Sequence, residues 1–328
     1  MRIVVLGATG HIGSAIVHEL TTRGHKVFGT GRRTSPPKNL QEVDFTYLRG
    51  DIDTDGQLDA WIQGSDIVVD AAAPYGLNLL IGKSDVDKRP LHYAQARTDR
   101  LLTALRKHNA QLIYISSSVT ERPDDNASLA TLQSKVVRKI YPYFQVKKLI
   151  EDRILEATTS GLRAVILRPT SCVGPWDAKP RELCWIPKLL CGEIPAVLRH
   201  KINVVDTRDL ACVLATVLEG DHDGEKITVS GHNTTTDEFL SQLCKSGGVA
   251  APAWGFPAAF SIVPLLCAEA MWASIGSTSP FPSLVSTLLC EQRWVEPDGA
   301  QQQLNISIRP LADTARDTVR WYRDIGYC

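Results

Sequence analysis

A tyrosine and a lysine, Tyr143 and Lys147, stand four positions apart in the sequence. On a helix, such positions lie one above the other on the same face. A free tyrosine has a pKa of about 10 and is a poor acid or base near neutrality, whereas a neighbouring ammonium group stabilises the phenolate and lowers that pKa. The spacing therefore predicts that Tyr143 exchanges protons and that Lys147 adjusts its pKa.

Three serines, Ser116, Ser117 and Ser118, follow an apolar stretch at residues 112–115 that is typical of a buried strand. Open α/β sheets bind ligands at the carboxyl ends of their strands. A serine hydroxyl at that edge can hold a substrate oxygen while the tyrosine protonates it. The alternative interpretation is structural, because short motifs recur by chance and a tyrosine on a helix face often only packs.

A glycine-rich turn comes near the start of the chain, where Gly7, Gly10 and Gly13 separate a short apolar run at residues 3–6 from a helical pattern at 14–23. Glycines allow a phosphate to approach the backbone, and the amides of the following helix then face it. The Gly-x-x-Gly-x-x-Gly spacing differs from the commonest dinucleotide fingerprint, so a purely structural turn is the competing interpretation. The turn predicts a dinucleotide site.

The second predicted strand ends at Gly31 and is followed by Arg32 and Arg33. An acidic residue at this point would bind the adenosine ribose hydroxyls, whereas a guanidinium group matches a 2′-phosphate. The cofactor predicted is therefore NADP (NADPH) rather than NAD. The alternative for the two arginines is a solvated surface loop without a ligand. For Asp51, two roles stay open: a contact with the adenine amine, or an ordinary turn aspartate.

Strands and helices alternate along the first part of the chain, which is typical of βαβ units and predicts an α/β fold with a Rossmann-type, doubly wound parallel sheet. A smaller, discontinuous lobe would bind the substrate. We expect the NADP-binding domain at residues 1–174 plus 204–231, and the substrate lobe with a closing helix at 175–203 plus 232–328. The strands predicted are residues 3–6, 26–30, 45–48, 67–71, 112–116, 164–167 and 226–229, with helices at 14–23 and 209–219.

Composition excludes several classes of function. Basic and acidic residues are equal in number, 36 each among 328 residues, so nothing indicates a nucleic-acid partner. No apolar stretch approaches the ~20 residues of an integral membrane segment. The eight cysteines lie between Cys172 and Cys328 without metal-ligand spacing, which predicts reduced thiols, a cytoplasmic location and no metal site.

These features together resemble the extended short-chain dehydrogenase/reductase family, in its dihydroflavonol reductase-like or NAD-dependent epimerase/dehydratase branch. The resemblance covers nearly the whole chain and implies that Ser118, Tyr143 and Lys147 are catalytic, that Pro169 lies against the nicotinamide and that a homodimer forms. It rests on residues 7–13, 116–118, 143–151, 168–175, 204–209 and 309–322. The residues expected to contact the cofactor are Gly7, Thr9, Gly10, His11, Ile12, Gly13, Arg32, Arg33, Asp51, Ile52, Ala72, Ala73, Ser116, Tyr143, Lys147, Pro169 and Cys172.

Two positions depart from the family pattern. Ala94 stands where the family usually has a supporting asparagine, which leaves a water molecule or Gln95 to take its place in the proton path. Val146 stands where a serine or threonine usually precedes the motif lysine, a change that should alter only local hydrogen bonding.

The sequence contains few signals that identify the substrate. Trp176, Trp185, Trp254 and Trp272 are consistent with an apolar, aromatic-lined pocket, although packing is the more common role of any single tryptophan. The apolar run 256–275 reads as a helix of the substrate lobe rather than a membrane-surface helix, because it lacks basic residues.

Three hypotheses follow. The first is an NADP-dependent oxidoreductase that reduces a ketone or aldehyde of a small, moderately apolar substrate. The second is an NAD(P)-dependent sugar epimerase or dehydratase that retains its cofactor; the missing asparagine after Pro169 and the sparse basic residues of the second lobe argue against it. The third is a non-catalytic protein that binds and senses NADP.

Overall fold

The computed structural model describes residues 1–54, 56–72, 90–121, 142–178, 185–194, 196–257, 262–275, 294–296, 302 and 304–327. The strands are β1 (Arg2–Leu6), β2 (Lys26–Gly31), β3 (Thr46–Arg49), β4 (Ile67–Asp70), β5 (Gln111–Ile115), β6 (Ala164–Pro169), β7 (Ser171–Val173), β8 (Ala196–Arg199), β9 (Lys201–Asp206), β10 (Lys226–Val229), β11 (His232–Thr235) and β12 (Trp254–Pro257). The helices are α1 (His11–Thr22), α2 (Gln57–Ile62), α3 (Pro90–His108), α5 (Pro142–Thr159), α6 (Ile186–Leu190), α7 (Thr207–Val217), α8 (Thr236–Gly247), α9 (Ile262–Ser274) and α12 (Leu311–Asp324), with 3₁₀ turns η1 (Lys38–Leu40) and η2 (Ser118–Thr120).

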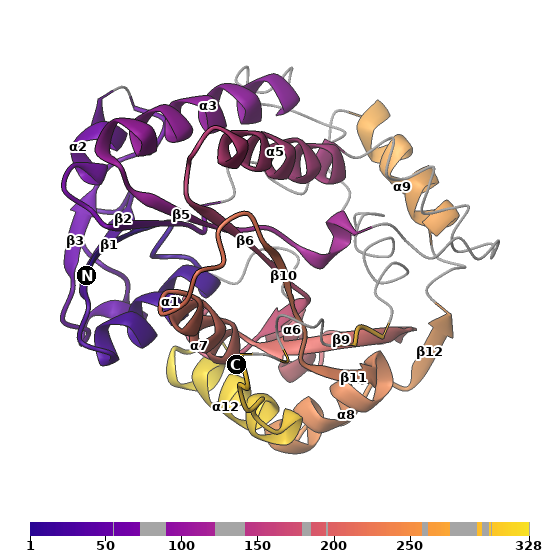
Figure 1. Cartoon of the computed structure of the whole chain (residues 1–328). Coiled ribbons are helices and arrows are strands. Elements are labelled where there is room, and N and C mark those ends of the chain that lie inside the picture. Colours follow the sequence, from indigo (N-terminus) through magenta and orange to yellow (C-terminus); the bar gives the residue numbers. More distant parts are fainter. Residues whose placement is uncertain are drawn as a thin grey trace.

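The centre of the fold is a seven-stranded parallel sheet with the strand order β10-β6-β5-β4-β1-β2-β3 (Figure 1). The chain runs outward from β1 through β2 and β3 and then returns to lay β4, β5 and β6 on the other side. This is the doubly wound order in which ligands bind where the direction reverses, at the carboxyl ends of β1 and β4. The predicted α/β Rossmann-type fold is confirmed.

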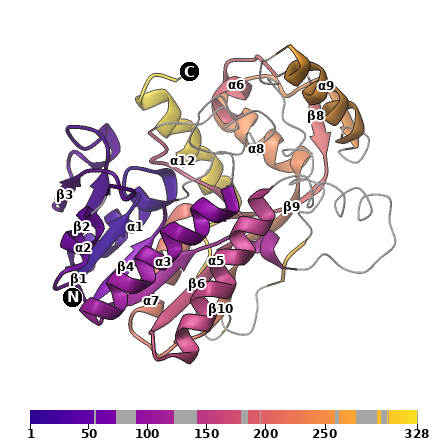
Figure 2. The same cartoon turned by 90° about the horizontal axis from the view of Figure 1, so that it is seen from above.

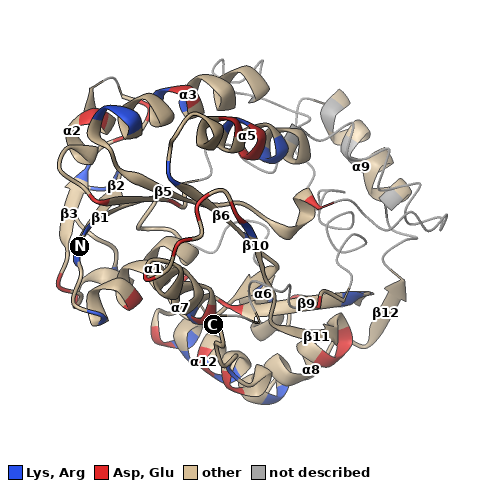
Figure 3. Cartoon of the chain, viewed as in Figure 1, with Lys and Arg blue, Asp and Glu red and all other residues tan. Residues whose placement is uncertain are grey.

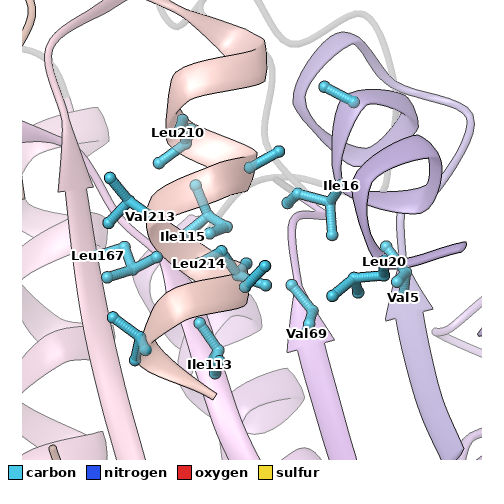
Figure 4. Close-up of a cluster of buried hydrophobic side chains, with 14 of the residues drawn as sticks. Val5, Ile16, Leu20, Val69, Ile113, Ile115, Leu167, Leu210, Val213 and Leu214 are labelled. Carbon is cyan, nitrogen blue, oxygen red and sulfur yellow. The ribbon is translucent and has the colours of Figure 1, made fainter. Parts of the chain in front are cut away.

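Helices cover both faces of the sheet, as the buried β-branched runs require (Figure 1). Helices α2, α3 and α5 pack on one face, and α1 and α7 pack on the other. In Figure 4, side chains from α1 and α7 meet those of the strands in one fully buried layer. Its members include Val5, Ile16, Leu20, Val69, Ile113, Leu167, Leu210, Val213 and Leu214. This apolar layer holds α1, and with it the glycine turn, against the sheet.

The strands predicted from the sequence are present with ends within two residues of the prediction. Helix α1 begins three residues earlier than predicted, at His11, because Gly10 already serves as its N-cap. The boundary matters for function, since it places the first amides of α1 directly after the glycine turn.

A second group of elements lies beside the carboxyl edge of the main sheet (Figure 2). Strand β9 pairs in parallel with β7 and antiparallel with β11, while β8 pairs with β12. Helices α6, α8 and α12 share a separate apolar cluster in which Phe239, Leu243, Val319 and Tyr322 are buried. The division of the chain into the two predicted domains stays a prediction.

Charged residues of both signs are interspersed over the helices (Figure 3), in line with the equal numbers of basic and acidic residues. Within the part of the chain that is described, no helix is long and apolar enough to cross a membrane.

Asp206 joins three elements through one carboxylate. It caps α7 by accepting from the backbone N–H of Arg208, at 2.8 Å, and it also accepts from the guanidinium of the same arginine at 2.9 and 2.7 Å. Thr314 on α12 donates its hydroxyl at 2.8 Å to Oδ2 of this carboxylate, which also accepts from the Arg208 guanidinium. Although burial opposes it, these bonds lower the pKa of Asp206. The carboxylate thus ties β9, α7 and α12 together only while it is ionised.

We predict that Asp206→Asn lowers the free energy of unfolding at neutral pH by about 2–4 kcal/mol, since charge-assisted hydrogen bonds and a largely buried ion pair are lost. A carboxylate with a lowered pKa stabilises the fold above its unfolded-state value of about 3.9, and that stabilisation disappears as pH falls through the folded value. Urea midpoints measured between about pH 6 and pH 3 should therefore fall more steeply for the wild type than for the variant. Asp313→Asn, which breaks only an exposed pair with Arg316, is the matched control; parallel curves for the wild type and Asp206→Asn would contradict the prediction.

Candidate active site

The glycine turn has no room for side chains at two of its positions. Gly7 has a φ of +79°, and a Cβ atom there would lie 3.0 Å from the Ala72 Cα atom at the end of β4. A Cβ atom on Gly13 would lie 2.1 Å from the carbonyl oxygen of Gly7. Gly10 donates its N–H to that same oxygen and begins α1 without a side-chain cap. The turn thus presents backbone and the first amides of a helix, a surface that fits a pyrophosphate.

His11, the first residue of α1, holds the turn against a distant loop. Its Nε2 atom hydrogen-bonds to the carbonyl oxygen of Gly174 at 3.1 Å and lies 3.4 Å from the hydroxyl of Thr207. Burial lowers the pKa of His11, so the imidazole is neutral near pH 7. Its role in this structure is to position the loop after β7, and it brings no positive charge to a bound phosphate.

The residues predicted to bind the adenosine half lie together at the ends of β2 and β3. Arg32 is 83% exposed and its guanidinium is 3.8 Å from the carboxylate of Asp51. Tyr47 donates its hydroxyl to the carbonyl oxygen of Arg33 at 3.0 Å. A Cβ atom on Gly31 would lie 2.5 Å from the hydroxyl oxygen of Tyr47, so this strand end admits only glycine without rearrangement. The two arginines therefore follow a closely packed strand end, and the guanidinium of Arg32 is exposed to solvent.

Three other predicted contacts lie at or beyond the ends of β2, β3 and β4. The Thr9 methyl group packs at Gly31, and Ile52 is partly buried against the face covered by α2 and α3. Ala72 donates its N–H to the carboxylate of Asp70 at 3.1 Å. Ala73 lies outside the described residues.

Tyr143 lies at the start of α5, half-buried, and hydrogen-bonds to the hydroxyl of Ser117. Burial raises the pKa of the phenol, and the bond with Ser117 offsets part of that rise. The serine that pairs with Tyr143 in this structure is therefore the second of the three, whereas the prediction placed Ser118 opposite the phenol. Ser118 begins the turn η2, and its catalytic role stays a prediction.

Lys147 is 5% exposed, and its ammonium group donates to the carbonyl oxygen of Ile115 at 2.9 Å. The same nitrogen lies 4.9 Å from the ring centroid of Tyr114. Burial lowers the pKa of Lys147 to about 8. That this ammonium lowers the pKa of Tyr143 stays a prediction. In this structure the ammonium is bonded to Ile115 at the end of β5, and burial raises the pKa of the phenol.

Ser116 is engaged by a buried carboxylate. Glu151, which is fully buried, accepts from the hydroxyls of Ser116 at 2.5 Å and Thr120 at 2.7 Å. Arg168 on β6 donates to both oxygens of this carboxylate, at 3.1 and 2.5 Å. The network joins α5 to β5, β6 and η2. In this structure Ser116, predicted to contact the cofactor, holds the scaffold beneath the site.

Pro169 ends β6, and Cys172 follows in β7 on the side of Tyr143. Burial raises the pKa of the Cys172 thiol to about 12, so the group is a neutral thiol near pH 7. It can pack beside a bound ring without adding charge.

One buried ion pair was not predicted from the sequence. Asp70, the last residue of β4, accepts two hydrogen bonds of 2.9 Å each from Arg97 on α3. Arg97 falls on the buried stripe of α3 between Ala94 and Leu101, and Asp70 ends an otherwise apolar strand. The signal that could have revealed the pair is a charged residue at a position where the periodicity predicts an apolar one. Ala94 itself is fully buried in the apolar cluster between α3 and the sheet.

The four tryptophans do not line one pocket. Trp176 stacks on His18 with ring centroids 4.0 Å apart, and Trp185 packs edge-on against Phe239. Trp254 on β12 and Trp272 on α9 are 67% and 37% exposed. The packing interpretation therefore holds for Trp176 and Trp185, while Trp254 and Trp272 are exposed on β12 and α9.

The fold and these residues define a nicotinamide-dependent enzyme of the short-chain dehydrogenase/reductase type. Residues 3–229 match the model of the NAD dependent epimerase/dehydratase family, so the chain belongs to that family, and the predicted resemblance is confirmed. The family binds NAD(P).

Relatives carry both reductase and epimerase names. A protein of Synechocystis sp. provisionally named dihydroflavonol 4-reductase is 26% identical over 98% of this chain and 95% of its own length. The 2-alkyl-3-oxoalkanoate reductase of Stenotrophomonas maltophilia is 32% identical over 54% of this chain and 52% of its own. The solved UDP-glucuronic acid 4-epimerase of Bacillus cereus, in complex with NAD and its sugar nucleotide, shares the fold with a TM-score of 0.72 at 21% identity, covering 99% of this chain and 100% of its own.

We predict that Ser117→Ala raises the pKa of Tyr143 further, because the hydroxyl that favours the phenolate is removed. Tyrosinate absorbance during an alkaline titration measures this, with the signal of Tyr143 obtained as the difference from Tyr143→Phe. Ser118→Ala is the matched control and should leave the pKa of Tyr143 unchanged. A shift in Ser118→Ala alone would instead assign the contact to the third serine.

Proposed function

We propose that this protein is an NADP-dependent reductase that converts a ketone or aldehyde of a small, moderately apolar molecule to the alcohol. The observation that carries the proposal is the half-buried Tyr143 phenol, hydrogen-bonded to Ser117 beside the carboxyl edge of a doubly wound sheet. The reductase names of the Synechocystis and Stenotrophomonas proteins support it.

Bound NADPH would supply the hydride for this reaction. The residues of the chain supply the proton: a raised pKa keeps Tyr143 protonated near neutrality, so the phenol is ready to donate to a carbonyl oxygen. A hydroxyl from the serine run, Ser117 or Ser118, would hold that oxygen. With a pKa of about 8, Lys147 keeps most of its charge at pH 7, and its ammonium would hold the nicotinamide ribose.

The preference for NADP rests on Arg32 and Arg33, whose fork-shaped guanidinium groups match a 2′-phosphate. Arg32 is exposed at the end of β2, and Gly31 leaves no acidic group there for the ribose hydroxyls. Asp51 lies close enough to pair with Arg32, which favours a role in orienting the guanidinium over an isolated turn residue.

The second candidate is a sugar epimerase or dehydratase that retains its cofactor, and the family and the Bacillus cereus structure keep it in view. Thr170, which stands after Pro169, donates its hydroxyl to the buried Asn203 at 2.7 Å and so serves packing. Purified protein that carries NAD, and that oxidises no NADPH with any carbonyl, would favour this candidate. A binding protein without turnover ranks last, because Tyr143 and Lys147 are both present. A homodimer stays a prediction.

We predict that Tyr143→Phe lowers turnover at least about 100-fold, since a positioned acid contributes on the order of 10²–10⁴-fold. Affinity for NADPH should stay within about threefold, because the ring is retained. Turnover is followed through loss of nicotinamide absorbance across a panel of ketones and aldehydes. Tyr322→Phe, which removes a hydroxyl bonded to Asp177 in the second lobe, is the control. Undiminished turnover in Tyr143→Phe would end this proposal.

We predict that the double variant Arg32→Ala/Arg33→Ala weakens NADPH binding about tenfold to 100-fold and leaves NADH binding nearly unchanged. The reason is the loss of charge-assisted hydrogen bonding, worth about 1.5–3 kcal/mol in total, to a group that only NADPH carries. Fluorescence titration with both cofactors measures the difference. The double variant Arg106→Ala/Arg320→Ala, at exposed positions on α3 and α12, controls for the loss of two positive charges. Equal losses for the two cofactors would show that the arginines do not read the 2′-phosphate.

A further inference from the structure

The ion pair between Asp70 and Arg97 is among the most deeply buried charged groups described, each residue being 1% exposed. The guanidinium donates from two nitrogens to the two carboxylate oxygens, both at 2.9 Å. Such a fork has a fixed geometry that a flexible lysine does not provide. Removing both charges from water is costly, so the pair calls for a functional explanation.

The pair shares a buried layer with Lys147. Asp70 and Tyr114 are register partners on β4 and β5, so their side chains leave the same face of the sheet. The ammonium of Lys147 lies 4.9 Å from the ring centroid of Tyr114. Helices α3 and α5, which carry Arg97 and Lys147, lie side by side over that face (Figure 2).

Among the described residues, the charged and titratable groups that face the Lys147 ammonium are Asp70 from β4, Arg97 from α3, Glu151 from α5 and Tyr114 from β5. Glu151 is already paired with Arg168. Asp70 is instead paired with Arg97, and Arg97 also faces the Lys147 ammonium.

Building on the proposed function, we propose that the Asp70–Arg97 pair is the positioning element for Lys147. Asp70 supplies the counter-charge that keeps a buried ammonium protonated, and Arg97 occupies both carboxylate oxygens so that Lys147 does not turn toward them. The ammonium then stays on the carbonyl oxygen of Ile115, near the end of β5. The pair thus supports the lysine from the helix on which Ala94 replaces the expected asparagine.

The two members of the pair act on the lysine in opposite directions. Burial lowers the pKa of Lys147, Asp70 raises it more than any other group, and Arg97 lowers it by less. Loss of Asp70 should therefore release the proton more easily, and loss of Arg97 should hold it more tightly. Loss of both should release it more easily, but by less than loss of Asp70 alone.

The test compares Asp70→Asn, Arg97→Gln and the double variant Asp70→Asn/Arg97→Gln with the wild type. Affinity for NADPH or NADH, whichever the wild type binds more tightly, is measured by fluorescence as a function of pH. The Lys147→Met variant identifies the inflection that belongs to Lys147, because that inflection disappears in it. We expect the inflection to move to lower pH in Asp70→Asn and to higher pH in Arg97→Gln, each by roughly one pH unit, a tenfold change in proton affinity.

The double variant keeps the test decisive if either single variant fails to fold, as judged by circular dichroism. It replaces the ion pair by two neutral amides and should show a smaller shift to lower pH. Asp209→Asn, which removes a buried carboxylate paired with Arg309 beside α7, is the matched control and should leave the inflection in place.

An inflection at the same pH in every folded variant would overturn the proposal and leave the pair with a purely structural role. Uniformly weaker binding without opposite displacements would do the same. Failure of the proposed function would look different, since the wild type would then turn over no carbonyl while the displacements remain.

Discussion

A lysine ammonium buried against an apolar sheet is the constraint around which this site is built. Removing such a charge from water is costly unless hydrogen bonds and a counter-charge compensate. Lys147 has a carbonyl acceptor at Ile115, the face of the Tyr114 ring and the nearby carboxylate of Asp70. These partners come from β4 and β5, so the sheet and α5 must keep one relative position for the charge to remain.

A second polar network secures the same face of α5 one turn further along the helix. Glu151 lies four residues after Lys147 on α5 and collects donors from β5, η2 and β6. Because Glu151 is fully buried, loss of one donor would leave its carboxylate underpaired, so the network favours a single arrangement. The polar groups around Lys147 and Glu151 therefore set the height and rotation of α5, and with them the position of Tyr143.

The pKa values of the site groups are compatible with the proposed carbonyl reduction. The phenol of Tyr143 is protonated and Lys147 largely charged near pH 7, while His11 and Cys172 are neutral. An acid that keeps its proton is suited to protonate the oxygen of a carbonyl during its reduction. The neutral imidazole and thiol leave Arg32 and Arg33 as the cations predicted to meet the cofactor's 2′-phosphate.

Much of this architecture could be predicted from the amino-acid sequence. The β-branched runs located the strands of the main sheet, and the three glycines located the turn that leads into α1. The spacing of Tyr143 and Lys147 placed both residues on α5. These features are predictable because local periodicity and backbone sterics act over a few residues. Only the tertiary structure decided that Ser117 contacts Tyr143, that Ser116 bonds Glu151 across 35 positions, and that Arg97 meets Asp70 across 27. It also decided that the pKa of Tyr143 rises, since burial depends on groups brought together from distant parts of the chain. Hydrogen-bond partners and desolvation are properties of assembled surroundings, and no local pattern records them.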